Sequence, residues 1–217
     1  MRAATRRAQS ACKRRGRKAD AKDETAVGRF YRHQSLPRER AQLRASFIRW
    51  ALFIVPAVVL LGFLSGQLAG SGEGDPWFAA LQKPDYYPDP GLFPIVWSIL
   101  YVMMGLAFAL VCSAWGAKGR GTAIVAFVIQ LAMNLAWSPL FFGQHEITYA
   151  FYLIVALNVM VALTIILFFR VRKMAALLLV PYLAWSIFAA FLNYEIRELN
   201  PEADGADTTG AVQRIDL

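Results

Sequence analysis

The sequence predicts an all-α integral membrane protein built as a five-transmembrane-helix bundle. Composition is the first reason: the 217-residue chain is 57% hydrophobic and 18% charged, with a mean hydropathy of +0.40, whereas soluble domains average about 25% charged residues. The placement of charge is the second reason, because charged residues gather at both ends and in short connectors. Buried helices of a soluble protein would instead carry a charged stripe facing water.

Five runs of the sequence contain no Asp, Glu, Lys or Arg. Each exceeds about 18 residues, the length at which an apolar stretch spans a bilayer as a helix. The runs define a membrane domain over residues 47–197, between a basic tail at 1–46 and an acidic tail at 198–217. The predicted spans are about 50–69, 94–115, 122–142, 147–169 and 174–194.

The basic tail has two possible partners. Residues 1–49 hold most of the Lys and Arg residues of the chain, including the run CKRRGRK. Clustered positive charge attracts either nucleic acid or anionic lipid. The segment has no recognisable nucleic-acid-binding motif, so we expect the lipid bilayer as its partner and no nucleic acid.

The loops predict an orientation, because basic residues in short loops mark the cytoplasmic side of a membrane. The N-terminal tail, the connector with Lys118 and Arg120, and the connector at 170–173 are basic, whereas the 70–93 loop and the last segment are acidic. This alternation predicts a cytoplasmic N-terminus, with the C-terminus and the 70–93 loop on the opposite face. Short loops and an Arg-rich composition without a transit peptide favour a bacterial cell membrane.

The sequence does not group the residues that a metal site or acid–base catalysis would need. Cys12 and Cys112 are far apart, His33 and His145 lack companion ligands, and no metal site is expected. The five spans contain no charged residue, which argues against a proton relay or an ion-coupled transporter. We therefore expect a binding protein rather than an enzyme, with no obligatory cofactor.

Polar and aromatic side chains share one face of the third predicted span. Gln130, Asn134, Trp137 and Phe141 are spaced by four, three and four residues, which places them on one helical stripe. Amides in lipid face the interior of a bundle and find partners there. The stripe fits either helix–helix packing or the wall of a cavity for a flat, mostly apolar ligand.

The 70–93 loop is the one long connector between the predicted spans. Its prolines limit backbone freedom, and its aromatic residues suit the membrane interface. The loop therefore fits either an interfacial anchor or a lid over the mouth of the bundle.

Three segments, LQKPDYYPDPGLFPIVWSILYVMMG, QLAMNLAWSPLFFG and VPYLAWSIFAAFLNYEIRELN, resemble the tryptophan-rich sensory protein family, also called the translocator protein or peripheral benzodiazepine receptor (TspO/MBR) family. The resemblance covers about residues 47–200. It implies a five-helix bundle that dimerises in the membrane and binds porphyrins and, in some members, sterols or synthetic ligands. This chain departs from the family pattern at Tyr86 and Tyr149, where a Trp is usual.

The resemblance also implies which residues surround a ligand, in a pocket between the helices that the 70–93 loop caps. The implied wall residues are Phe93, Trp97, Asn134, Trp137, Tyr149, Trp185, Ala189 and Leu192. The implied lid residues are Trp77, Tyr86 and Pro88, and a loose pattern for sterol contact falls on Leu192, Tyr194 and Arg197.

Three functions remain open at this point. The first is a regulatory receptor or carrier that binds a porphyrin such as protoporphyrin IX, and also sterol-like molecules, as a homodimer. The second is light-dependent breakdown of porphyrin, for which the resemblance implies Trp97 and Trp185. The third is a structural membrane protein without a ligand.

Overall fold

The computed structural model of the chain describes residues 44–72 and 74–205. The chain divides into two units, residues 1–46 and 47–217, and the architecture below is that of the second unit. Almost all of the predicted basic tail at 1–46, and the acidic tail beyond residue 205, lie outside the described residues.

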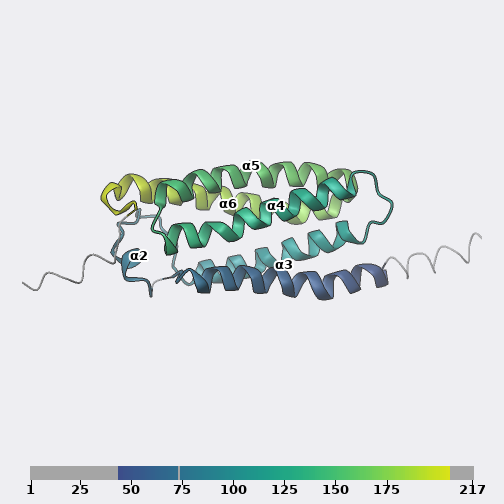
Figure 1. The fold of residues 1–217 in the computed structure, drawn as a ribbon, viewed down its shortest axis with the longest axis horizontal. Helices are drawn as coiled ribbons and strands as arrows, with labels where there is room; N and C mark the ends of the chain where they lie inside the picture. The colour runs from purple at the N-terminus through teal and green to yellow at the C-terminus, as the bar shows by residue number, and fades with distance from the viewer. Residues whose placement is uncertain (1–43, 73, 206–217) are drawn as a thin grey trace, which may run out of the picture. The chain divides into compact units, whose positions relative to one another are not determined.

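The described residues include five helices that are long and apolar enough to cross a membrane. The predicted all-α five-helix membrane bundle is therefore confirmed, and Figure 1 shows its helices running along a common direction. The helices are Arg44–Leu68, α3 (Leu92–Cys112), α4 (Arg120–Ser138), α5 (Ile147–Val171) and α6 (Lys173–Leu199).

Three shorter elements lie at one end of the bundle. The helix α2 (Pro76–Ala80) forms within the first loop, and the π-helix η1 (Pro139–Gly143) continues α4. A 3₁₀ turn, η2 (Pro201–Ala203), follows α6. We call this end of the bundle the loop end, and the end with the α3–α4 and α5–α6 connections the opposite end.

Several helix boundaries differ from the predicted spans, and the first helix already begins at Arg44 rather than at 50. The helix α3 ends at Cys112 rather than at 115, because the chain turns through Gly116 and Gly119, whose φ angles of 76° and 79° are in the left-handed region. The helix α6 continues to Leu199 rather than ending at 194. Its charged last turn still forms helix, since hydrogen bonding along the backbone does not require an apolar sequence.

Glycines let the first helix approach α3 closely. A Cβ added at Gly105 would lie 2.8 Å from the Cα of Val55, and one added at Gly62 would collide with the ring of Tyr101. The hydroxyl of Ser65 also donates a 2.6 Å hydrogen bond to the carbonyl of Leu135 on α4. Small residues at such positions are typical of helix packing in membranes.

Two groups of buried side chains fill the bundle. The central cluster contains stacked rings: Phe127, which is fully buried, lies 4.2 Å from Phe108 and 5.9 Å from Phe168 between ring centroids. The loop-end cluster joins the first loop to the helix ends, and it consists of Phe78, Leu81, Phe141, Ile147, Ala150 and Ile196.

Candidate functional site

The first loop folds over the loop end as a short helix with one buried ring. Asp75 caps α2 by accepting a 3.0 Å hydrogen bond from the backbone N–H of Trp77, as aspartate does at helix N-termini. The α2 ring of Phe78 is buried and meets Phe142 edge to face at 5.1 Å. The ammonium of Lys83 lies 4.6 Å above the same ring, which adds a cation–π attraction.

The indoles of two tryptophans both contact the ring of Phe141. Trp137, on α4, stacks on Phe141 at 4.9 Å with the rings 18° apart. Trp77, on α2, meets Phe141 at 5.6 Å and lies 4.3 Å from the ring of His145. The π-helix η1 widens the last turn after Pro139, and it carries Phe141 to this buried position.

The segment after α6 ties the first loop to the bundle, and we call residues 200–205 the clasp. Asn200 accepts a 2.8 Å hydrogen bond from the N–H of Gln82 and donates a 2.9 Å bond to its carbonyl. The indole N–H of Trp77 points to the carbonyl of Ala203 at 3.4 Å. Asp204 accepts from the N–H of Thr148 at 3.1 Å, and the clasp thereby holds loop and helix α5 together.

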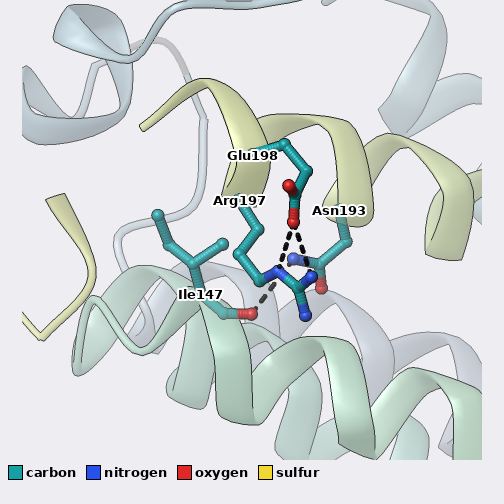
Figure 2. A network of polar contacts seen from close by, with 4 residues as sticks. All are labelled: Ile147, Asn193, Arg197 and Glu198. Atoms are coloured by element: carbon teal, nitrogen blue, oxygen red, sulfur yellow. Dashed lines mark hydrogen bonds and ion pairs between the residues drawn. The ribbon is translucent and has the colours of Figure 1, made fainter. Parts of the chain in front are cut away.

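Two amides beneath the loop each link three helices. The phenol of Tyr101 donates to Asn134 Oδ1 at 2.9 Å, and Asn134 Nδ2 donates to the phenol oxygen of Tyr182 at 3.1 Å. Nearer the loop end, Trp137 Nε1 donates to Asn193 Oδ1 at 3.3 Å, and Asn193 Nδ2 donates to the carbonyl of Ile147 at 3.2 Å, as Figure 2 shows for the second bond. These bonds satisfy buried polar groups that would otherwise be costly in lipid.

Two further indoles lie between α3 and α6. Trp97 lies 5.6 Å from Tyr101 and 6.3 Å from Tyr182 between ring centroids. Trp185 meets Phe93 edge to face at 5.8 Å. The indoles and phenols of α3 and α6 therefore continue the aromatic layer formed by Trp137 on α4.

Four residues in the middle of the spans carry buried polar atoms without a hydrogen-bond partner among the described residues. Gln130 is fully buried, and neither of its amide atoms is paired. The expectation that both stripe amides find partners is therefore wrong for Gln130 and right for Asn134. The reason is that Tyr101 and Tyr182 lie within hydrogen-bonding distance of Asn134, whereas no polar group among the described residues lies within reach of the Gln130 amide. The other three atoms are Asn158 Oδ1, Trp185 Nε1 and Ser186 Oγ.

A groove of about 630 Å³ opens between α3 and α6. Its lining is apolar and includes Trp185, and the side chain of Ile99 in it is 55% exposed. The lining residues are Val96, Ile99, Leu100 and Met103 from α3, with Pro181, Ala184, Trp185 and Phe188 from α6.

A family model described as the TspO/MBR family matches residues 53–199. The chain belongs to the TspO/MBR family. Among its relatives, Tryptophan-rich protein TspO of Chlorobaculum tepidum is 44% identical over 126 residues, which are 58% of this chain and 80% of that protein. Translocator protein of Ovis aries is 38% identical over 141 residues, covering 64% and 83% of the two chains. Tryptophan-rich sensory protein of Cereibacter sphaeroides is 35% identical over 162 residues, covering 71% and 96%.

The structure brings together most, but not all, of the wall residues expected from the TspO/MBR resemblance. Phe93 contacts Trp185, and Trp97 and Asn134 both contact Tyr182. Ala189, on α6, is half-buried and packs against the central cluster. Tyr149 is 64% exposed on α5 and is not among these contacts.

The three expected lid residues lie in different surroundings. Trp77 is tied into the clasp, whereas Tyr86 is half exposed and stacks on Phe191 at 5.8 Å. Pro88, expected in the lid, is half-buried in the same loop. Desolvation, together with the nearby Glu195 carboxylate, raises the pKa of the Tyr86 phenol.

The three residues of the sterol pattern do not share one face. Leu192 is buried in the bundle, whereas Tyr194 is 39% exposed. The Arg197 guanidinium lies 5.0 Å from the ring of Phe151, and it pairs with Glu198 at 2.6 Å (Figure 2).

Three residues of this site were missed by the sequence-based prediction. They are the hydrogen-bonding partners of predicted wall and lid residues: Tyr182, Asn193 and Asn200. A signal was present for two of them, because a phenol and an amide stand within an otherwise apolar span. Across residues 44–72 and 74–205, no group of three or more His, Cys, Asp or Glu side chains could hold a metal ion.

Proposed function

We propose that the chain is a membrane receptor or carrier that binds a porphyrin between its helices, beneath the first loop. The observation that carries this proposal is the layer of indoles, phenols and amides that α3, α4 and α6 contribute under the clasped loop. Its members are Trp97, Tyr101, Asn134, Trp137, Tyr182 and Trp185. Flat aromatic walls with a few orienting polar groups suit a flat, mostly apolar ligand.

Porphyrin binding would replace contacts between aromatic side chains by contacts with the ligand, and it would not require a charged site. Trp137 stacks on Phe141, and Phe93 meets Trp185 edge to face. A porphyrin inserted between such rings would replace ring–ring contacts with ring–ligand contacts of similar kind. The amide of Asn134 and the indole N–H of Trp137 would then orient the ligand edge, once their bonds to Tyr182 and Asn193 open.

Titration of the purified full-length chain in lipid nanodiscs tests the proposal. Protoporphyrin IX should quench tryptophan fluorescence saturably, and the double variant Trp137→Ala, Trp185→Ala should bind at least about tenfold more weakly, the result of losing roughly 1.4 kcal/mol. Tyr152→Ala is the control, because Tyr152 is exposed on α5 and is not among the expected wall residues. Unsaturable quenching, or equal affinity in the double variant, would refute a porphyrin pocket at these residues.

The second candidate function is light-dependent breakdown of the bound porphyrin. Trp97 favours it, because its indole contacts both Tyr101 and Tyr182, so an excited pigment nearby would have oxidisable rings within contact distance. Illuminating the complex separates the two candidates. Bleaching in the wild type that slows in Trp97→Phe and Trp185→Phe supports breakdown, and equal bleaching in all three proteins supports a binding role alone.

We further propose that the loop end faces away from the cytoplasm and that the chain acts as a homodimer in a bacterial cell membrane. Basic residues lie at the opposite end and acidic residues at the loop end, as the orientation requires. Labelling of single cysteines from outside intact cells should reach residue 74 and not residue 118. Chemical cross-linking in native membranes tests the dimer. The charges concerned are Lys118, Arg120, Arg172 and Lys173 against Glu146, Glu198, Glu202 and Asp204.

A further inference from the structure

We propose that the α3–α6 groove is the entrance through which the ligand passes sideways from the bilayer into the bundle. This inference rests on the binding role proposed above and adds the route to it. The ligand class is a flat, apolar molecule dissolved in the membrane, for which protoporphyrin IX is the probe.

The first argument is the surface on which the groove opens. It lies between two membrane-spanning helices, and its side chains are apolar throughout. Ile99 is 55% exposed, and Pro181 and Ala184 are also exposed. In a bilayer these side chains face hydrocarbon, so the groove admits molecules that partition into lipid and excludes water-soluble ones. Its volume of about 630 Å³ falls among those of ligand sites, which measure roughly 300–1,000 Å³.

The second argument is that one side chain belongs to both the groove and the expected ligand wall. Trp185 lines the groove, and its ring meets Phe93 at 5.8 Å and Phe188 at 5.4 Å. Its Nε1–H is buried without a partner among the described residues. A buried indole without a hydrogen bond loses none when it rotates, and it gains one if an incoming ligand offers an acceptor.

The third argument is the local backbone of α6. Pro181 lies inside this helix and is one of the residues that line the groove. Proline has no N–H, so the helix lacks one backbone hydrogen bond at the carbonyl of Leu177. Helices bend at such positions. The wall of the groove can therefore move away from α3 at a lower cost than an unbroken helix could.

The fourth argument is that the other approach is fastened. The loop end is closed by the buried ring of Phe78 and by the hydrogen bonds of the clasp to Gln82 and Trp77. Entry past the loop would break these contacts together. Entry through the groove begins instead with the separation of Trp185 from Phe93, whose ring centroids lie 5.8 Å apart.

Binding kinetics in lipid nanodiscs test the route with the full-length chain. Ala184→Phe places a ring in the groove, and Ala156→Phe adds the same ring to an exposed position of α5 as the matched control. We expect Ala184→Phe to slow both association and dissociation of protoporphyrin IX about tenfold, as a blocked gate would, with an unchanged Kd. Ala156→Phe should leave both rates unchanged, as should Asn200→Ala, which loosens the clasp.

Each contrary result has a distinct meaning. Unchanged rates in Ala184→Phe, or faster association in Asn200→Ala, would overturn the groove as entrance and assign entry to the loop. Weaker binding with faster dissociation in Ala184→Phe would overturn it by making the groove the resting site. A changed number of chains per nanodisc would overturn it in favour of a second copy in the groove. A wild type without saturable binding refutes the proposed function itself, whereas the other results leave that function standing.

Discussion

The two ends of the bundle are held together by different kinds of contact. At the opposite end, stacked rings such as Phe127 and Phe168 and small residues fill the space between helices, and connections are short. At the loop end, a smaller cluster of buried side chains is joined by hydrogen bonds between elements far apart in the sequence, such as the two between Asn200 and Gln82. Stacked apolar packing is dense and allows little rearrangement, whereas single hydrogen bonds in membranes contribute about 0.6 kcal/mol on average.

This difference in contacts indicates different roles for the two ends of the bundle. The opposite end fixes how the helices lie, and the loop end can exchange its contacts without unfolding the bundle. Single substitutions at the loop end should therefore change local opening more than they change global stability. Four experiments would break or sharpen the comparison.

The largest effect should follow from removing a ring of the central cluster. Phe127→Ala deletes a fully buried side chain that stacks on two others, and we expect the free energy of unfolding to fall by about 3–5 kcal/mol. Denaturant titration in detergent measures the change. Val128→Ala is the neighbouring control at an exposed position and should change stability little. Equal losses in both variants would contradict the assignment of the core to this end.

A smaller loss should follow from removing the amide that joins α4, α5 and α6. Asn193→Leu leaves Trp137 Nε1 and the Ile147 carbonyl without their partner, and we expect a destabilisation of about 1–3 kcal/mol. Denaturant titration in detergent again measures the change, and a shift of the tryptophan fluorescence maximum reports on the surroundings of Trp137. Phe191→Leu, at an exposed position of the same helix, provides the control, and a variant as stable as wild type would argue that these bonds contribute nothing.

The two buried amides of α4, one hydrogen-bonded and one not, sharpen the comparison further. Asn134→Leu should destabilise the bundle by about 1 kcal/mol, because two phenols lose their partner. Gln130→Leu should be neutral or stabilising, since it replaces an unpaired buried amide by an apolar group of similar size. The free energy of unfolding of both variants should be measured in one detergent. A larger loss for Gln130→Leu than for Asn134→Leu would mean that the Gln130 amide is hydrogen-bonded in the membrane.

The smallest change in global stability should accompany loss of the clasp. Asn200→Ala removes both bonds to Gln82, and we expect less than about 0.5 kcal/mol of global destabilisation. Hydrogen exchange at residues 76–82 should nevertheless accelerate clearly, because local opening does not need the whole bundle to unfold. Glu202→Ala, an exposed clasp residue, serves as control. Unchanged exchange would show that the loop does not depend on Asn200.

The sequence predicted the bundle well, because the absence of charge over five long runs has one physical explanation. It also placed Asn134 and Trp137 on an inward face, since helical spacing decides which residues share a stripe. It could not predict that Gln130 stays unpaired while Asn134 is paired. That outcome depends on how far each helix slides along its neighbours, which periodicity does not encode.

The helix ends were harder to predict for a related reason. The sequence run at 113–115 is apolar, yet the chain leaves the helix at Cys112 because glycines follow. Conversely, α6 continues through charged residues to Leu199, where hydropathy predicts an end. Contacts of the clasp were not predictable either, because they join residues 118 and 126 positions apart in the sequence.

That separation also sets an order of events during synthesis. Gln82 and Trp77 leave the ribosome early, and their partners Asn200 and Ala203 leave it near the end. At about 5–20 residues per second, the loop waits on the order of ten seconds before it can be fastened. Until then the loop lacks its contacts with the clasp, so the loop end is the last part of the bundle to be fastened.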